Sequence, residues 1–427
     1  MSSIYNFGKE PMLNHREELS KIDTFGRLRV SNPVTLFDFH HVNNYQENSS
    51  FSEIIYNGST FTYSNDSYVQ LSVTSTIGSK VVSQTKQYVP YQPGKSKLVF
   101  MTGILETSGG TTGIRSRIGT FDDENDKNTS LYDSGGNGLF FELDGNDLYV
   151  VERRSSNGTG QTDYRVKQSE WNIDTFGAGS LNPSKKIIND FSKCLLFVFD
   201  MEWLGVGFSR FGFVLDGKIH YCHIFKHKKL IKPYIRYAKL PLRYEIENVS
   251  SSSEGKLRKI CGTVLSEGGY NIRGRVFSDG TNANSITVPS SKYIPVISLK
   301  LKNEFNRNTL YLKKIDFLIS ATTNKPIHYD VRFNPSVLEG VSFRDINTMS
   351  IAEISVTGTT IVGGKTINSG YIKNKESGSF FEGLDDLLSN LQINSNITGE
   401  SDILSVAAIG IGGDAELYIQ ANWLEIN

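Results

Sequence analysis

Apolar and polar positions alternate along most of the 427 residues, and this pattern predicts a chain built from β-strands. In Tyr68–Val73, the side chains of Val69, Leu71 and Val73 fall on one face of an extended segment, while those of Tyr68, Gln70 and Ser72 fall on the other. The same reasoning predicts strands at Lys80–Val89, Lys97–Leu105, Ile114–Phe121, Leu139–Leu143, Asp147–Val151, Leu195–Leu204, Phe208–Leu215, Lys218–Phe225, Leu240–Asn248 and Leu257–Leu265.

The pattern weakens in a glycine-rich stretch and then restarts. The later predicted strands include Ile294–Leu301, Thr309–Ser320, Ile327–Phe333, Ile351–Val356, Leu404–Ile411 and Glu416–Ile426. We therefore expect an all-β fold, with an N-terminal extended arm over residues 1–50 and a β-sandwich of jelly-roll type over 51–270. A linker over 271–290 and a second β-rich domain over 291–427 complete the predicted organisation.

Two segments carry helical patterns instead. Asn14 can cap a short helix over Asn14–Ile22, with Glu17 three residues later. Leucines fall on one face of a second predicted helix over Glu382–Leu391.

Composition narrows the function classes. Lysine plus arginine and aspartate plus glutamate each total 45, so the formal net charge is zero, which argues against nucleic-acid binding through a global basic field. The three cysteines are scattered, and no CxxC pair is present, so neither a disulfide framework nor a structural zinc site is predicted. No apolar run is long enough to span a bilayer, and the N-terminus lacks a signal-peptide pattern. We expect no membrane insertion.

Candidate metal and catalytic residues are few. We interpret His40 and His41 as part of a solvated loop, and His220 and His223 as structural. Asp122–Asn128 resembles a calcium loop but lacks the required glycine and glutamate, so we predict a solvated hairpin loop there. No nucleophile elbow, P-loop or HExxH motif is present. The adjacent pairs Asp122/Asp123 and Asp385/Asp386 do not suit acid/base chemistry, because neighbouring residues on a strand point to opposite faces. We expect no enzyme activity, cofactor or metal.

The stretch Asp23–Asp38 stands out near the N-terminus. Arg27 and Arg29 alternate with Leu28 and Val30, as in a strand with one charged face, and Pro33 then interrupts the chain. We predict an anchor to other proteins, in which the arginines face a neighbouring chain or solvent and the apolar side chains are buried. Its assembly residues would be Phe25, Arg27, Leu28, Arg29, Val30, Pro33, Leu36 and Phe37.

Asp23–Asp38 resembles the opening of a family of virion structural proteins found in tailed bacteriophages and some other large DNA viruses. Further matching segments follow in the same order over residues 20 to 270. They are Tyr91–Lys95, Arg117–Gly119, Phe121–Asp123, Gly138 with Phe140–Glu142, Trp203–Gly207, Arg210–Phe213, Asp216–His223, Leu240–Glu245 and Ser266–Gly269. Beyond residue 291 the resemblance is looser, down to Asn422–Glu425.

The resemblance implies a virion protein assembled in a host cytoplasm: a surface fibre or capsid decoration, anchored by its N-terminal arm to capsid, neck or tail proteins. By analogy with viral fibres we expect a homotrimer. Two alternatives stay open, a host-glycan-binding adhesin and a polysaccharide depolymerase. Exposed aromatic rings would stack on sugars in the adhesin, and Tyr56, Tyr63, Tyr132 and Tyr371 are the candidates.

Overall fold

The computed structural model describes residues 22–29, 32–42, 50–105, 111–126, 135–155, 160–228, 230–271, 274–373, 377–380 and 392–426. It divides into two compact units. The first takes in Met1–Thr85, Val89–Asn125 and Gly135–Asn271, and the second takes in Lys86–Tyr88, Asp126–Ser134 and Ile272–Asn427. The described residues contain strands and one short 3-10 helix, η2 (Gln168–Glu170), but no α-helix, so the fold is all-β as expected. The two predicted helices fall largely or wholly outside the described residues.

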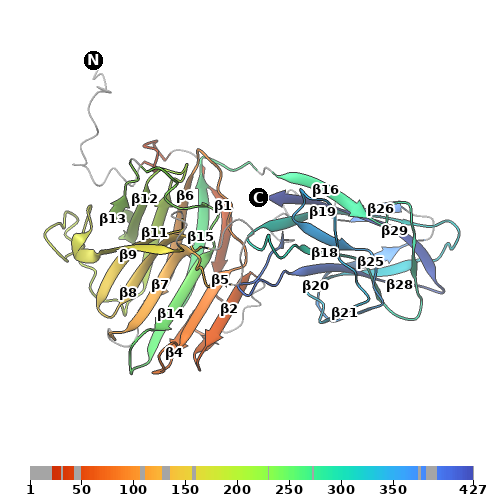
Figure 1. The fold of residues 1–427 in the computed structure, drawn as a ribbon, viewed down its shortest axis with the longest axis horizontal. Helices are drawn as coiled ribbons and strands as arrows, with labels where there is room; N and C mark the ends of the chain where they lie inside the picture. The colour runs from red at the N-terminus through yellow and green to blue at the C-terminus, as the bar shows by residue number, and fades with distance from the viewer. Residues whose placement is uncertain are drawn as a thin grey trace, which may run out of the picture. The chain divides into compact units, whose positions relative to one another are not determined.

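The first unit contains two antiparallel sheets (Figure 1). The eight-stranded sheet has the order β13-β12-β11-β6-β15-β4-β3, and β1 also pairs with β15. Its strands are β1 (Val34–His40), β3 (Thr60–Tyr63), β4 (Val69–Val73), β6 (Ser96–Ile104), β11 (Leu195–Met201), β12 (Ser209–Leu215), β13 (Lys218–Phe225) and β15 (Gly255–Glu267).

The seven-stranded sheet has the order β10-β9-β8-β7-β14-β5-β2. Its strands are β2 (Phe51–Tyr56), β5 (Lys80–Thr85), β7 (Ile114–Phe121), β8 (Gly138–Asp144), β9 (Asp147–Arg154), β10 (Thr162–Lys167) and β14 (Leu242–Asn248). Many of these strands lie far apart in the sequence, as in the pair β5 and β14. The order therefore depends on long connections rather than on consecutive hairpins alone.

A shared apolar core joins the two sheets into a β-sandwich. The ring of Phe141 on β8 lies 5.1 Å from that of Phe197 on β11, 5.5 Å from that of Phe211 and 4.9 Å from that of Phe213 on β12. All four side chains are buried. Tilted and edge-on aromatic contacts of this kind hold the inner faces of the sheets together.

The second unit also packs two antiparallel sheets around one core (Figure 1). The first sheet contains β16 (Arg275–Gly280), β17 (Ile286–Val288), β19 (Thr309–Ile319), β26 (Ser377–Phe380), β27 (Gln392–Ile393) and β29 (Ala415–Ile426). The second contains β18 (Ile294–Leu301), β20 (Ile327–Phe333), β22 (Arg344–Asp345), β23 (Ala352–Ser355), β25 (Lys365–Ile372) and β28 (Ile403–Gly410). A separate pair joins β21 (Val337–Glu339) to β24 (Thr360–Val362).

The structure differs from the predicted organisation at two places. Residues 34–40 were assigned to an arm, but they form β1, which pairs with Cys261–Ser266 of β15. The predicted linker over 271–290 contains β16 and β17, and both pair with β29. β16 and β17 are short and lie in a glycine-rich stretch that resembles a loop in sequence. They are strands because the long β29 supplies a partner edge, which local pattern cannot reveal.

Candidate functional site

The segment Asp23–Arg29 forms a loop closed by its own first side chain. Asp23 is buried, and its Oδ1 accepts hydrogen bonds from the backbone N–H groups of Phe25 and Arg27, each at 2.9 Å. The Nε of Arg27 donates to Asp23 Oδ2 at 2.7 Å. Gly26 has a φ of +79°, and Ile22 bridges Leu28 across the loop. The predicted strand at this point is therefore a turn, because an aspartate side chain competes with strand pairing for the backbone donors.

Arg29 inserts into a polar cluster at the end of the eight-stranded sheet. Its Nη2 donates to Asp200, whose carboxylate is fully buried, and to the hydroxyl of Tyr221 at 2.9 Å. Its Nε lies 3.2 Å from Glu267 Oε1. Ser96 donates to Asp200 Oδ1 at 2.9 Å, Tyr221 donates to Asp200 Oδ2, and Arg210 Nη1 lies 3.9 Å from that same oxygen. The loop also reaches β6 through Thr24, whose Oγ1 lies 2.9 Å from Ser96 Oγ. Through Thr24 and Arg29 the loop is thus bound to β6, β11, β13 and β15.

The predicted anchor residues do not share one buried face. The side chain of Leu28 is 67% exposed, although we expected it to be buried, and that of Arg29 is only 14% exposed, although we expected it to face solvent or a neighbour. We expected Leu28 to be buried and Arg29 to be exposed, and the opposite is found. Arg29 is buried because nearby buried carboxylates stabilise a guanidinium more than they would an apolar side chain.

The remaining anchor residues are spread along the segment. Phe25 is half-buried, with the Cζ of Arg27 4.6 Å from its ring centroid, and Pro33 is exposed. Leu36 and Phe37 pack against the core of the first unit. Val30 lies outside the described residues. Leu36 and Phe37 therefore bind the segment to its own unit, and the proposed contacts of the anchor residues with other proteins stay a prediction.

Burial and neighbouring charges shift the pKa values of Glu267 and Arg29 in this cluster. Burial, together with the negative charge of Asp200, raises the pKa of Glu267 to about 7, although Arg29 acts to lower it. Burial acts to lower the pKa of Arg29, but Asp200, Tyr221 and Glu267 raise it above its ordinary value. Arg29 therefore stays charged, and Glu267 titrates near neutral pH.

A ladder of alternating charges crosses the outer side of the seven-stranded sheet. Arg117 on β7 lies between Glu142 on β8, with Nε to Oε2 at 2.7 Å, and Glu245 on β14. Glu245 also contacts Arg243 at 2.6 Å and Lys80 at 3.1 Å. Although burial acts to raise the pKa of Glu245, Lys80, Arg243 and Arg117 hold it well below its usual range. A carboxylate with three cationic partners stabilises the sheet and is unsuited to proton transfer.

The sequence analysis missed this ladder. Its signal was present as charged residues two apart, Arg115 and Arg117 on one predicted strand and Arg243, Glu245 and Glu247 on another. Residues two apart share a face of a strand, so each segment carries a charged face. Only the sheet order shows that these faces are neighbours.

The first two aspartates of the acidic stretch after β7 are buried, which corrects the expected solvated hairpin loop at these positions, whereas Glu124 and Asn125 are exposed. Asp122 is fully buried and Asp123 is 5% exposed. Arg153 Nη1 contacts Asp123 Oδ2 at 2.8 Å, and Tyr237 donates to Asp122 Oδ2 at 2.8 Å. Although burial acts to raise the pKa of Asp123, Arg153 holds it well below its usual range. The carboxylates orient the loop instead of facing water, because they have buried partners from distant strands.

The histidines that were considered as metal ligands lie among residues of the fold itself. His40 is exposed at the end of β1, whereas His41 is buried against the rings of Phe39 and Tyr63, not in a solvated loop. His223 accepts a hydrogen bond from the backbone of Asn172 at 3.3 Å, and burial lowers its pKa to about 4. The described parts of the chain contain no group of three or more histidine, cysteine or acidic side chains suited to a metal ion. None of their helices is long and apolar enough to cross a membrane.

One serine, one glutamate and one histidine meet inside the first sandwich. Ser209 Oγ donates to Glu152 Oε2 at 2.8 Å, and His227 Nε2 lies 3.0 Å from the same oxygen. All three side chains are buried. In a nucleophilic triad the histidine links serine to the acid, whereas here the carboxylate links serine to histidine. This arrangement does not activate the serine.

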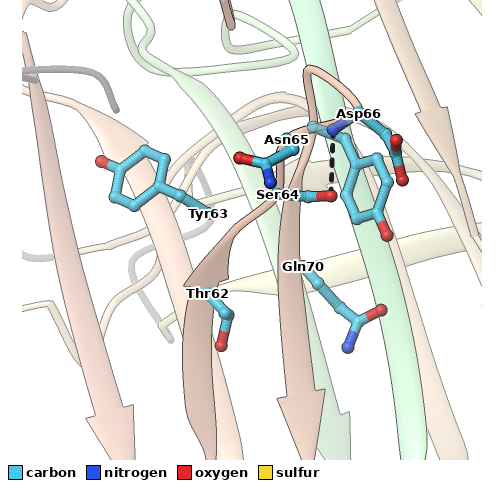
Figure 2. A pocket seen from close by; sticks show the side chains of 7 residues that line it. Thr62, Tyr63, Ser64, Asn65, Asp66 and Gln70 are labelled. Carbon is cyan, nitrogen blue, oxygen red and sulfur yellow. Dashed lines mark hydrogen bonds between the residues drawn. The ribbon is translucent and has the colours of Figure 1, made fainter. Parts of the chain in front are cut away.

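A polar depression of about 510 Å³ surrounds the turn between β3 and β4 (Figure 2). It is lined by Thr62, Tyr63, Ser64, Asn65, Asp66, Tyr68 and Gln70. The backbone N–H of Ser64 donates to the carbonyl of Tyr68 at 3.0 Å, and that of Asp66 donates to Ser64 Oγ at 3.2 Å. Asn65 and Asp66 are exposed. The turn thus presents a carboxylate and amides on a backbone that its own hydrogen bonds hold in place.

The four tyrosines considered as sugar-stacking residues have different surroundings. Tyr63 lines the depression and is half-buried, whereas Tyr56 is 50% exposed at the end of β2. Tyr371 in the second unit is 72% exposed, and its ring lies 4.7 Å from that of His328. Tyr132 lies outside the described residues. The sequence analysis did not select Asn65, Asp66, Tyr68 or Gln70, although the polar run between two tyrosines marked a turn.

No family model matches the chain, and no curated protein matches it. Solved structures resemble it only distantly. An endo-β-1,4-glucuronan lyase from Trichoderma reesei is 12% identical, with a TM-score of 0.37 over 54% of this chain and 95% of the lyase. A legume lectin-like domain from Entamoeba histolytica is 11% identical, with a TM-score of 0.33 over 57% of this chain and 100% of that domain. An endo-1,3-β-glucanase from Streptomyces sioyaensis is 8% identical, with a TM-score of 0.37 over 55% of this chain and 96% of the glucanase. Likeness at this level assigns no function.

Proposed function

We propose that the first unit binds a carbohydrate in the polar depression at the β3–β4 turn. The observation that carries the proposal is the combination of Asp66, Asn65 and Gln70 with tyrosine side chains in one concave surface. Sugar hydroxyl groups both donate and accept hydrogen bonds, so carboxylate and amide side chains suit them. A tyrosine ring offers an apolar face to the C–H side of a sugar and a hydroxyl to its rim.

The location of the depression also supports binding. β3 is the edge strand of its sheet, so a long glycan chain can cross the turn without meeting a further strand of that sheet. The underlying β4 is firmly held, with Val69 and Leu71 fully buried. A ligand would therefore meet polar groups on a rigid support, which lowers the entropy lost on binding.

A glycan array followed by calorimetry with the best ligand tests this proposal. Asp66→Ala and Gln70→Ala are each expected to weaken binding by about tenfold or more, as loss of a hydrogen bond to a buried ligand group does. Glu254→Gln, an exposed change in the loop before β15, serves as the matched control and should leave affinity unchanged. Tyr371→Ala in the second unit should also leave it unchanged. Binding that survives both depression variants, or absence of any glycan ligand, would refute the proposal.

We further propose that the chain acts on the surface of a virus particle, with the residues before Ile22 as its attachment. The resemblance of Asp23–Asp38 to virion structural proteins supports this setting. Asp23 and Arg29 bind their own loop to the first unit. The proposed attachment is therefore shorter than the predicted arm over residues 1–50 and lies before Ile22. A glycan-binding unit on a particle would serve host attachment.

A further inference from the structure

Arg258 on β15 lies beside the depression without a carboxylate partner. It is directly opposite Gln70 of β4 in the strand register. Its Cζ is 4.5 Å from the ring centroid of Tyr68, so the guanidinium lies over that ring. Both Gln70 and Tyr68 line the depression. The positive charge therefore lies next to two of the residues that line the proposed binding surface.

The surroundings of Arg258 leave it incompletely satisfied. The side chain is half-buried, and its Nε is buried with no hydrogen-bond partner among the described residues. No carboxylate in the described part of the chain forms an ion pair with it, and its contact is the ring of Tyr68. A buried donor without a partner costs free energy. The two terminal nitrogens of Arg258 are not buried and have no hydrogen-bond partner among the described residues, so an anionic ligand group can pair with them.

Other arginines of the first unit differ in this respect. The following arginines each lie within ion-pair distance of an aspartate or glutamate: Arg27, Arg29, Arg115, Arg117, Arg153, Arg154, Arg165 and Arg243. Arg210 also lies 3.9 Å from Asp200. Most arginines of the unit thus have a carboxylate partner, whereas Arg258 has none among the described residues.

We propose that the depression selects an acidic glycan, whose carboxylate or sulfate group pairs with Arg258 while its hydroxyl groups contact Asp66, Asn65 and Gln70. This inference rests on the proposed carbohydrate binding and names its ligand class. A guanidinium matches the two oxygens of a carboxylate or sulfate group with parallel N–H donors. The cation–π contact with Tyr68 fixes the orientation of the guanidinium before the ligand arrives.

The test compares three oligosaccharides of equal length with the full chain: one of glucose, one of glucuronic acid and one of sulfated glucose. We expect an acidic ligand to bind about tenfold more tightly than the neutral one at low salt, as one charge-assisted pair provides. The preference should shrink at high salt because ions screen the pair. The carboxylated and sulfated ligands show which anionic group the site takes.

Variants separate this inference from the broader proposal. Arg258→Met should abolish the preference for acidic ligands and leave the affinity for the neutral one within about twofold. Arg258→Lys, which keeps the charge, should retain part of the preference, and Arg275→Met, an exposed arginine in the second unit, should change nothing. Equal affinity for all three ligands, unchanged in Arg258→Met and Arg258→Lys, would overturn acidic selectivity while carbohydrate binding stood. No binding to any ligand would overturn both.

Discussion

The guanidinium of Arg29 donates to the carboxylate of Asp200, which lies 171 residues later in the chain. Asp200 is on a central strand of the eight-stranded sheet and is fully buried. Arg29 belongs to a loop without regular strand pairing. The pair therefore explains how a short N-terminal loop keeps a defined position on the first unit, and it provides the first prediction.

Arg29→Ala should destabilise the first unit by about 3–5 kcal/mol, because it removes the close cationic partner of the buried Asp200 and leaves only Arg210, 3.9 Å away. Urea unfolding followed by tryptophan fluorescence measures the change. Arg27→Ala is the matched control: its side chain is 50% exposed, so we expect a loss of about 1 kcal/mol or less. Equal effects of the two variants would contradict the role assigned to the buried pair.

Glu267 should make stability depend on pH. Its pKa in the folded state is about 7, raised by burial and by Asp200 and Asp23 from an ordinary value of 4.5, with Arg29 opposing the shift. A raised pKa means that the folded state binds its proton more tightly than the unfolded state does. The resulting stabilisation is complete below about pH 4.5 and is lost as the pH rises through 7.

Glu267→Gln should therefore flatten the profile of unfolding free energy between about pH 5 and pH 8, since glutamine does not titrate. Denaturant titrations at closely spaced pH values provide the measurement. A variant profile with the same slope as the unmodified protein would show that other groups cause the dependence.

The charge ladder predicts a second contrast between a buried and an exposed carboxylate. Glu245→Gln removes the charge that neutralises Arg117, Arg243 and Lys80, and should cost about 3–5 kcal/mol. Asp147→Asn on β9 removes the partner of Lys167 from an exposed pair and should not change stability measurably. Thermal and urea unfolding compare the two. A negligible effect of Glu245→Gln would mean that its cationic partners find other carboxylates.

The attachment proposal predicts the result of two truncations. Deleting residues 1–21 should abolish incorporation into virus particles and leave the unfolding of the first unit unchanged. Deleting residues 1–29 should also destabilise the unit, because it removes Arg29 from Asp200. Quantitative immunoblotting of purified particles measures incorporation. Normal occupancy by the protein that lacks residues 1–21 would refute the proposed anchor.

Strand positions could largely be read from the sequence, whereas the candidate site could not. The predicted segments Ile114–Phe121, Ile294–Leu301 and Ile327–Phe333 coincide with β7, β18 and β20. Alternation with a period of two is a local property, so each strand carries its own signal. Tyr63 was a candidate for stacking on sugars, but Asp66 and Arg258, on which the proposed ligand contacts depend, were not predicted from the sequence.

The strands could be predicted but the candidate site could not, because the site depends on which residues lie opposite each other across the sheet. Burial of one face decides where Val69 and Leu71 point, and the same alternation places Gln70 on the other face. Nothing local indicates that Gln70 faces Arg258, which lies on a strand almost two hundred residues later. Strand order and register decide such neighbours, and they follow from packing of the whole core.

The sequence by itself determined an all-β chain, its main turns and the segment that resembles virion proteins. Tertiary structure alone decided that Arg29 is buried against Asp200 while Leu28 is exposed, and that Arg258 lies beside the depression without a carboxylate. The physical reason is that apolar alternation acts between neighbouring residues, whereas the favourable place for a charge depends on which distant charges the fold brings within reach.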